Sequence, residues 1–201
     1  MEQLDQVEET SLQQEDEVNI ALLVLEREGS DIIRDALRFA TEKHDGQVRR
    51  GTNLPYITHP VAVSHIVIQT KQSRRLQELA AAAILHDVLE DTETSFADLA
   101  TRFPPLVASL VHELTSDDKE IARVGKLEYM KAKMRGMSSY GLVIKLADRL
   151  HNISDKPTQK MVRDTMDIMA HLEAARTLTA TQKDLVKRIQ QLCQTKLGGH
   201  S

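Results

Sequence analysis

Apolar residues recur along most of the chain at intervals of three and four, the spacing that places them on one face of an α-helix. No segment alternates apolar and polar residues convincingly enough to predict a β-strand. The pattern predicts helices over residues 18–28, 31–43, 61–69, 76–89, 95–102, 105–114, 121–135, 140–152, 162–173 and 179–196. We therefore expect an all-α fold.

The stretch from Asp45 to Pro60 interrupts this helical pattern. Glycine, asparagine and proline punctuate it, and these residues favour turns over helices. We expect a long ordered loop near residues 45–60, or a short hairpin. A loop of this length inside a compact domain is usually functional or disordered, and its charged and aromatic residues favour a function.

The length of 201 residues suits one well-buried core and is too short for two comfortable domains. Residues 1–20 contain seven acidic residues and neither Lys nor Arg. We expect residues 1–17 to be an acidic, flexible N-terminal segment, because such a composition buries too little apolar surface to fold alone. The folded domain should span residues 18–196, followed by a flexible tail over 197–201.

The net charge of −4 is distributed unevenly. Subtracting the −7 of residues 1–20 leaves about +3 on the rest of the chain, which can host a small polyanionic molecule. No block of Lys and Arg is dense enough to indicate duplex DNA binding. An aromatic content of 3% argues against a base-stacking surface for single-stranded nucleic acid.

Cysteine content and apolar runs bear on the cellular compartment. Cys193 is the only cysteine, so a reducing compartment is the simplest interpretation. The longest apolar run, near Ile20 to Leu25, is far too short for a membrane span and follows acidic residues, unlike a secretory signal. We expect a cytoplasmic protein that binds neither nucleic acid nor membrane, and the sequence leaves its oligomeric state open.

Two histidines and two aspartates are candidate metal ligands. They are His59, the adjacent pair His86-Asp87, and Asp148. Two imidazoles and two carboxylates suit a hydrated divalent transition metal. The ordinary alternatives are an exposed or structurally hydrogen-bonded His59 at a loop-to-helix junction, and a buried hydrogen bond or two exposed polar residues at His86-Asp87.

Glu90 and Asp91 stand close to this pair. The segment from Leu76 to Asp91 contains neither Gly nor Pro and predicts a continuous helix. On such a helix Glu90 follows His86 by four residues and Asp91 follows Asp87 by four, so all four groups would share one side. Carboxylates beside a metal can move protons during hydrolysis.

Asp148 and Asn152 also lie four residues apart, within the helix predicted over 140–152, and so share one face. Asp148 can then be the distant metal ligand, and Asn152 an amide that orients a substrate. For Asn152 alone, a helix cap or a solvent contact would be the ordinary interpretation.

Four motifs, in order and at suitable separations, resemble the hydrolase domain of Rel/SpoT proteins within the HD phosphohydrolase superfamily. They are His-Asp-Gly-Gln-Val-Arg-Arg (44–50), Pro-Tyr-Ile-Thr-His-Pro (55–60), His-Asp-Val-Leu-Glu-Asp-Thr (86–92) and Lys-Leu-Ala-Asp-Arg-Leu-His-Asn (145–152). The resemblance covers roughly Ile32 to Lys156 and implies a single helical HD domain. In length the chain is similar to the stand-alone small alarmone hydrolases, and its Thr-Ser-Asp-Asp-Lys segment (115–119) resembles a segment of those enzymes.

The resemblance implies a role for each matching residue. His59, His86, Asp87 and Asp148 match the family's metal ligands, usually for Mn²⁺. Glu90 and Asp91 match its catalytic acidic pair. Residues that match nucleotide and phosphate contacts, or that lie in the same motifs as further candidates, are Arg50, Asn152, Lys145, Tyr56 and His44.

The implied reaction removes pyrophosphate from the 3′ position of guanosine tetra- or pentaphosphate, giving GDP or GTP. One alternative is an HD phosphohydrolase acting on another nucleotide, such as NADPH. Another is a catalytically weak protein that binds the alarmone. The chain departs from many relatives at Gly-Thr-Asn-Leu (51–54) and at Ile-Ser-Asp (153–155), two segments that border the nucleotide in the family.

Overall fold

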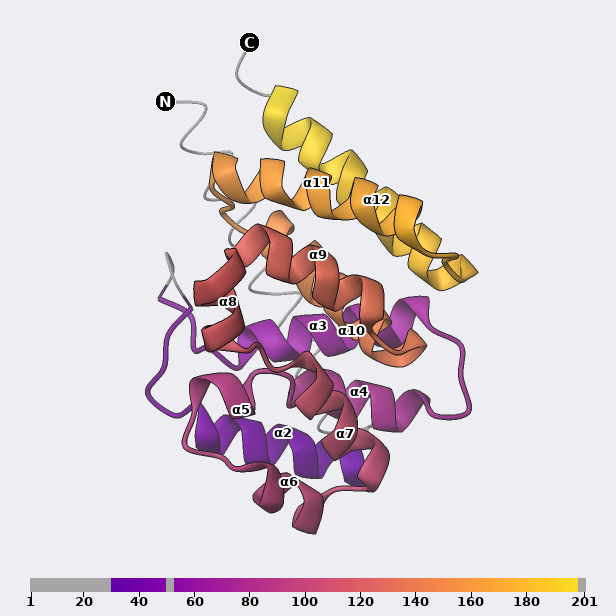
Figure 1. Cartoon of the computed structure of the whole chain (residues 1–201). Helices are drawn as coiled ribbons and strands as arrows, with labels where there is room; N and C mark the ends of the chain where they lie inside the picture. Colours follow the sequence, from indigo (N-terminus) through magenta and orange to yellow (C-terminus); the bar gives the residue numbers. More distant parts are fainter. Residues whose placement is uncertain (1–29, 50–52, 199–201) are drawn as a thin grey trace, which may run out of the picture.

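The computed structural model describes residues 30–49 and 53–198, and within these ranges every regular element is a helix (Figure 1). This confirms the all-α class. The acidic segment 1–17, the helix predicted over 18–28 and Arg50 lie outside the described residues. The boundaries at 18 and 196 stay predictions, and the last helix continues to Gly198.

The helices follow one another with short connections. They are α2 (Asp31–Lys43), α3 (Thr58–Thr70), α4 (Leu76–Ile84), α5 (Val88–Asp91), α6 (Phe96–Arg102), α7 (Pro105–Leu114), α8 (Asp118–Val124), α9 (Lys126–Gly136), α10 (Ser139–Ser154), α11 (Gln159–Ala175) and α12 (Ala180–Gly198). Helices α2 and α7 have the predicted bounds.

The described residues between α2 and α3 form a short hairpin, which is the second of the two predicted alternatives. Val48 and Pro55 form an antiparallel bridge. The Arg49 amide donates to the Leu54 carbonyl at 2.8 Å, and the Tyr56 amide donates to the Gln47 carbonyl at 2.9 Å. The Tyr56 ring lies beside His59 of α3, and Arg49 reaches the end of α10.

Helix α3 begins three residues earlier than predicted, so His59 lies in its first turn and is not at a junction before it. Pro60 is compatible with this position, because amides in the first turn of a helix have no partner within the helix. His59 is thereby held by regular backbone.

The predicted continuous helix over 76–89 is broken. Helix α4 ends at Ile84, residues 85–87 form a turn, and α5 begins at Val88. Adjacent residues of an α-helix do not face the same side. The break therefore permits His86 and Asp87, which are neighbours in sequence, to point into one site.

The helix predicted over 121–135 is also two helices, α8 and α9. They meet at Gly125, whose φ of 85° lies in the left-handed region that side chains other than glycine rarely adopt. The sequence pattern continued across this glycine because the apolar spacing on both sides stays helical.

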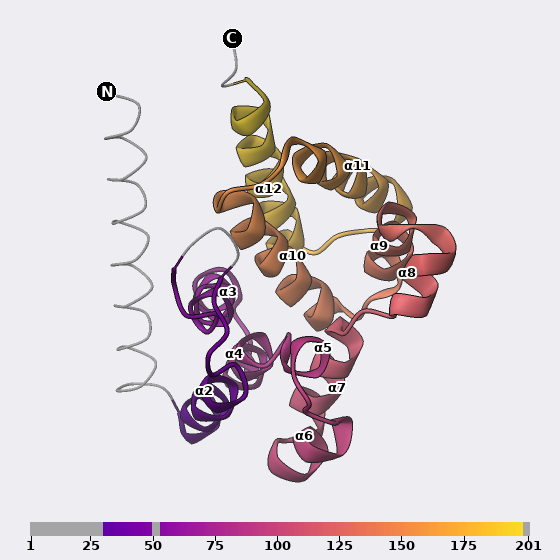
Figure 2. The same ribbon diagram turned by 90° about the vertical axis from the view of Figure 1, so that its left-hand side faces the viewer.

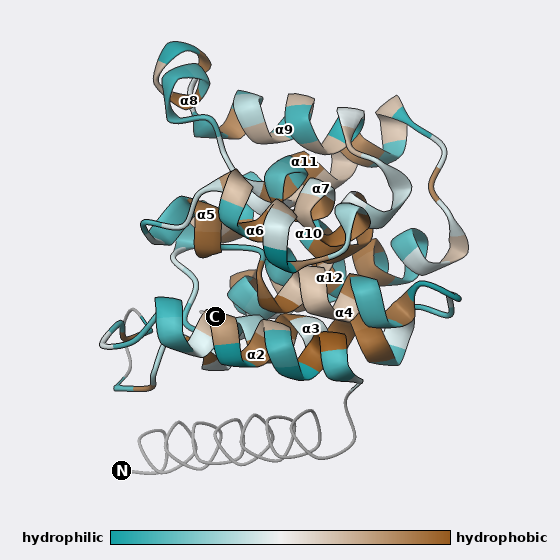
Figure 3. Cartoon of the chain, turned by 90° about the horizontal axis from the view of Figure 1, so that it is seen from below, coloured by the Kyte–Doolittle hydropathy of each residue, from teal (hydrophilic) through white to brown (hydrophobic). Residues whose placement is uncertain are grey.

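The core lies between two groups of helices. Helix α10 packs against α3 and α4 on one side and against α11 and α12 on the other (Figure 2). From Leu79 to Leu85 every residue is fully buried, and this part of α4 also contacts α2 and α7. By contrast α8 has no buried residue and is largely polar at the edge of the bundle (Figure 3). Among the described helices none combines the length and apolarity that crossing a membrane requires.

Candidate metal and catalytic site

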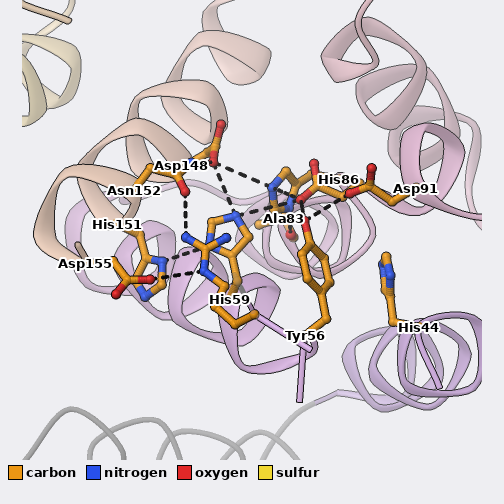
Figure 4. A network of polar contacts seen from close by, with 12 residues as sticks. His44, Tyr56, His59, Ala83, His86, Asp91, Asp148, His151, Asn152 and Asp155 are labelled. Atoms are coloured by element: carbon orange, nitrogen blue, oxygen red, sulfur yellow. Dashed lines mark hydrogen bonds and ion pairs between the residues drawn. The ribbon is translucent and has the colours of Figure 1, made fainter. Parts of the chain in front are cut away.

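The four predicted ligands converge where α3, the turn after α4, and α10 meet. Figure 4 labels three of them, His59, His86 and Asp148. One ligand atom from each of His59, His86 and Asp87 lies within 4.8 Å of the others. Asp148 joins them, because its Oδ1 lies 3.3 Å from His59 Nε2 and 3.9 Å from His86 Nε2. All except Asp87 are buried.

His86 is oriented by the carbonyl of Ala83, 2.8 Å from its Nδ1. A carbonyl oxygen only accepts hydrogen bonds, so Nδ1 carries the proton and Nε2 presents its lone pair. Nε2 is buried without a hydrogen-bond partner, although it lies 3.0 Å from Asp87 Oδ2. An unpartnered buried nitrogen is costly unless a ligand satisfies it.

His59 is oriented by His151, which the sequence analysis did not identify. The two Nδ1 atoms are 2.7 Å apart, and His59 Nε2 faces the carboxylates. Burial lowers the pKa of His151 from 6.5 to about 3, so this imidazole is neutral and can accept a hydrogen bond near neutral pH. A partner of this kind fixes the tautomer of a metal-binding histidine.

Asp148 is held as a carboxylate by two neighbours on its own helix. Lys145 Nζ lies 2.9 Å from Asp148 Oδ2, and Asn152 Nδ2 donates to Oδ1 at 2.5 Å. Burial alone would raise the pKa of Asp148, but the Lys145 ammonium outweighs it and helps to hold that pKa well below its usual value. Asp148 therefore stays ionised.

The site fits a divalent transition metal on these observations. Burial opposes ionisation of Asp87, yet the neighbouring histidines lower its pKa. Burial also opposes protonation of His86, but the charges of Asp87 and Asp148 raise its pKa. The carboxylates of the cluster thus attract positive charge to His86 Nε2, which lacks a hydrogen-bond partner. The nitrogen and oxygen ligand atoms of the cluster are those that bind divalent transition metals.

The two acidic residues of α5 point to different partners. Tyr56 Oη lies 2.6 Å from Asp87 Oδ2 and 3.0 Å from Asp91 Oδ2, so it bridges a candidate ligand and a candidate acid. Burial and the charge of Asp87 raise the pKa of Asp91. Glu90 instead accepts a hydrogen bond from the Ser116 amide at 3.0 Å. The continuous helix on which all four groups would share one side is broken between α4 and α5. Asp87 and Asp91 nevertheless keep the helical spacing, because the Asp91 amide donates to the Asp87 carbonyl at 2.8 Å.

The hairpin and the end of α10 form the rim of the site. Arg49 donates to Asn152 Oδ1 at 2.6 Å and to Asp155 Oδ2 at 3.2 Å. Arg49 therefore provides a guanidinium at this rim, whereas the predicted Arg50 lies outside the described residues. The two arginines are adjacent in the first motif, so the motif alone could have indicated either.

His44 supports Tyr56 from the other side. The ring centroids are 4.7 Å apart, and His44 Nδ1 lies 2.8 Å from Gln47 Oε1. Gln47 in turn donates to the Asp91 carbonyl at 2.9 Å. The first motif therefore contacts the acidic pair through Tyr56 and Gln47.

A hollow of about 670 Å³ adjoins the site through Ser116. The connection between α7 and α8 lines it, together with residues of α7, α8 and α9. The lining residues are His112, Glu113, Thr115, Ser116, Asp117, Asp118, Lys119 and Lys133.

Known proteins are similar to this chain in sequence and in fold. The HD domain family model matches residues 36–179. A Danio rerio protein named guanosine-3′,5′-bis(diphosphate) 3′-pyrophosphohydrolase MESH1 is 33% identical over 125 residues, which cover 62% of this chain and 68% of that protein. The bifunctional (p)ppGpp synthase/hydrolase SpoT of Escherichia coli strain K12 is 36% identical over 152 residues, covering 70% of this chain.

The matched region is a small part of the longer relatives: 21% of SpoT and 21% of an Aquifex aeolicus 3′-pyrophosphohydrolase that is 32% identical. Among solved structures, a metazoan orthologue of SpoT described as hydrolysing ppGpp superimposes with a TM-score of 0.69 at 26% identity, covering 83% of this chain and 96% of the other. A Listeria monocytogenes protein with a TM-score of 0.54 at 20% identity shares the fold.

Proposed function

This chain belongs to the HD-domain family, as its motifs predicted, and we propose that it is a Mn²⁺-dependent hydrolase that removes the 3′-pyrophosphate of guanosine tetra- or pentaphosphate. The observation that carries the proposal is the convergence of two imidazoles and two ionised carboxylates beside an acidic pair. The activities of the named relatives support the choice of substrate.

His59, His86, Asp87 and Asp148 would hold the metal ion. When bound, the ion supplies a Lewis acid for the phosphoryl group and lowers the pKa of a bound water. Two carboxylate oxygens beside two imidazole nitrogens suit Mn²⁺, which accepts oxygen ligands readily. His151, Ala83 and Lys145 keep these side chains in position and in the required protonation states.

We assign different tasks to Glu90 and Asp91 because their surroundings differ. The Glu90 carboxylate accepts a hydrogen bond from the Ser116 amide, which fixes its direction, and it acts as the base that orients water and accepts its proton. The raised pKa of Asp91 lets it keep a proton at higher pH than an ordinary aspartate, so it is suited to protonate the leaving 3′ oxygen. The Tyr56 hydroxyl holds Asp91 beside the metal ligands.

The nucleotide lies, in this proposal, along the rim formed by the hairpin and α10. Asn152 and Arg49 offer an amide and a guanidinium there, and a guanidinium suits bidentate contact with phosphate. Arg50 and His44 remain proposed contacts from the same motif. We assign Lys145 to Asp148 and not to the nucleotide, because its ammonium is buried against that carboxylate. A cytoplasmic enzyme agrees with a single free, buried cysteine.

The test is a panel of nucleotides and metals. Chelator-treated protein is loaded in turn with Mn²⁺, Mg²⁺ or Zn²⁺ and offered ppGpp, NADPH and GTP, and the products are separated by ion exchange. We expect GDP and intact pyrophosphate from ppGpp, most rapidly with Mn²⁺. Orthophosphate from NADPH without cleavage of ppGpp would establish the alternative substrate.

A double variant tests the roles of the acidic pair. Glu90→Gln with Asp91→Asn should abolish turnover while Mn²⁺ binding, measured by calorimetry, persists. Glu93→Gln, an exposed residue just after α5, is the matched control and should keep full activity. A wild-type protein that binds ppGpp without cleaving it under all metals would indicate the alarmone-binding alternative.

A further inference from the structure

We propose that Tyr129 and Lys133 of α9 are positioning residues for Glu90, which they hold through the backbone of the connection between α7 and α8. This connection is residues 115–117, and it is called the α7–α8 connection below. The inference rests on the catalytic role proposed for Glu90. It extends that role by naming what fixes the carboxylate.

The contact to Glu90 is a backbone one. Glu90 is exposed, and its Oε2 accepts a hydrogen bond from the Ser116 amide at 3.0 Å. An exposed glutamate otherwise samples many rotamers, whereas a backbone amide is a donor in a fixed direction. The position of Glu90 is therefore only as fixed as that of Ser116.

Helix α9 holds the α7–α8 connection on both sides of Ser116. Lys133 Nζ donates to the Thr115 carbonyl at 2.5 Å and to Tyr129 Oη at 3.3 Å. The Asp117 amide donates to the same Tyr129 Oη at 2.8 Å. Tyr129 is itself buried in the core, so the hydroxyl is a rigid reference point. The residues before and after Ser116 are thus both tied to one helix.

Apart from its bonds to α9, the α7–α8 connection bonds to the two helices that it joins: Thr115 donates to the Val111 carbonyl of α7, and Asp117 Oδ1 accepts from amides of the first turn of α8. The connection borders the hollow of about 670 Å³, and Lys133 lines the same hollow. The helix that follows, α8, has no buried residue. A segment without packing on one side depends on its hydrogen bonds for its position. Loss of the bonds to α9 should therefore free Ser116, and Glu90 with it.

The surroundings of Lys133 disfavour its charged form. Burial lowers the pKa of Lys133, and the nearby Lys145 lowers it further, while Glu90, Glu113 and Asp117 oppose that change. The half-buried Lys133 ammonium donates to the Thr115 carbonyl, and it interacts electrostatically with both Lys145 and Glu90. Its position links the α7–α8 connection to the acidic pair both by geometry and by charge.

Kinetics of three variants test the proposal. Lys133→Met and Tyr129→Phe should each lower kcat for ppGpp by about tenfold or more, the scale expected when an acid–base group loses its alignment, and leave KM within about twofold. Lys131→Met is the matched control on the same helix, because Lys131 pairs with Glu128 away from the α7–α8 connection. A rise in KM at unchanged kcat would instead make Lys133 a substrate contact and overturn the proposal.

A double-mutant cycle tests whether Lys133 acts through Glu90. In the Glu90→Gln background, Lys133→Met should cost no further residual rate, because the group that it positions is already gone. Independent, multiplying losses would overturn the proposal. Ser116→Pro removes the donor amide directly and should reproduce the loss caused by Lys133→Met. Thr115, with φ −59° and ψ 131°, already has the extended conformation that a residue before proline prefers.

Amide hydrogen exchange at Ser116 provides a readout that needs no substrate. In the metal-loaded full chain this amide should exchange slowly in the wild type and in Lys131→Met, and faster in Lys133→Met and Tyr129→Phe. Unchanged exchange in the two α9 variants would overturn the proposal even if ppGpp is hydrolysed. If the wild type hydrolyses no ppGpp, the proposed function fails, and the exchange data still decide whether α9 positions Ser116.

Discussion

Replacing Lys145 by methionine should destabilise the metal-free protein strongly. The Lys145 ammonium lies 2.9 Å from Asp148, and the two side chains are only 11% and 8% exposed. Methionine keeps most of the volume and removes the charge, so the Asp148 carboxylate would be buried without its cationic partner. Removing one partner of a buried ion pair costs about 3–5 kcal/mol.

The lower end of that range applies, because Asp148 keeps its hydrogen bond from Asn152. A loss of about 3 kcal/mol corresponds to a fall in Tm of roughly 6–12 °C for a domain of this size. Differential scanning calorimetry in chelator measures it. Lys160→Met is the control, since Lys160 pairs with Asp164 while 78% exposed, and it should change Tm by less than about 2 °C.

Adding Mn²⁺ should narrow the gap between Lys145→Met and the wild type, because a bound cation supplies positive charge to the same carboxylate. The reasoning would be refuted if Lys145→Met costs no more than Lys160→Met in chelator. It would equally be refuted if the gap widens on adding Mn²⁺, since Asp148 would then not be the group that both charges stabilise.

Three further predictions concern single side chains. Tyr56→Phe removes the hydroxyl between Asp87 and Asp91, so kcat for ppGpp should fall about tenfold, and an unchanged kcat would contradict the bridging role. The folded-state pKa of His151 is about 3 against an ordinary 6.5, so its contribution to stability is complete above pH 6.5 and is lost as the pH falls toward 3, by at most about 1.4 kcal/mol per pH unit. Urea unfolding in chelator should therefore show the stability of the wild type falling relative to His151→Gln between pH 7 and 4; a constant difference would refute this. Cys193 is fully buried and burial raises the pKa of its thiol, so a thiol reagent should label it only when urea unfolds the chain, and rapid labelling of the native protein would contradict the buried position.

Most helices could be predicted because their apolar spacing is set by the core that they face. The bounds of α2 and α7 follow from that spacing together with clear end signals. The break at residues 85–87 could not be predicted, because the preceding segment from Leu76 to Leu85 is rich in strong helix formers and no Gly or Pro marks the end of α4. Tertiary structure overrides local preference there. Gly125 did carry a signal for the division between α8 and α9, since an isolated glycine near a helix end favours a C-cap.

The four candidate metal ligands could be predicted from residue types and motifs, and the structure brings all four together. The contacts that hold these ligands in position could not be predicted in the same way. His151 reaches His59 across 92 positions in sequence, and Ser116 reaches Glu90 across 26. Such pairings depend on how α10 and the α7–α8 connection are packed, which periodicity does not encode. Arg49 was not among the predicted contacts, because the motif alone does not show that its side chain reaches Asn152 of α10.

The turn at residues 85–87 has a consequence for how such a protein can change over time. The donor pair His86-Asp87 follows directly from a fully buried segment, Leu79 to Leu85, whereas Arg49 and Asp155 lie in a hairpin and at a helix end. Substitutions at Arg49 or Asp155 therefore leave the segment that carries His86 and Asp87 unchanged. A protein divided in this way can acquire a new nucleotide preference by changes at its rim without rebuilding its reaction centre.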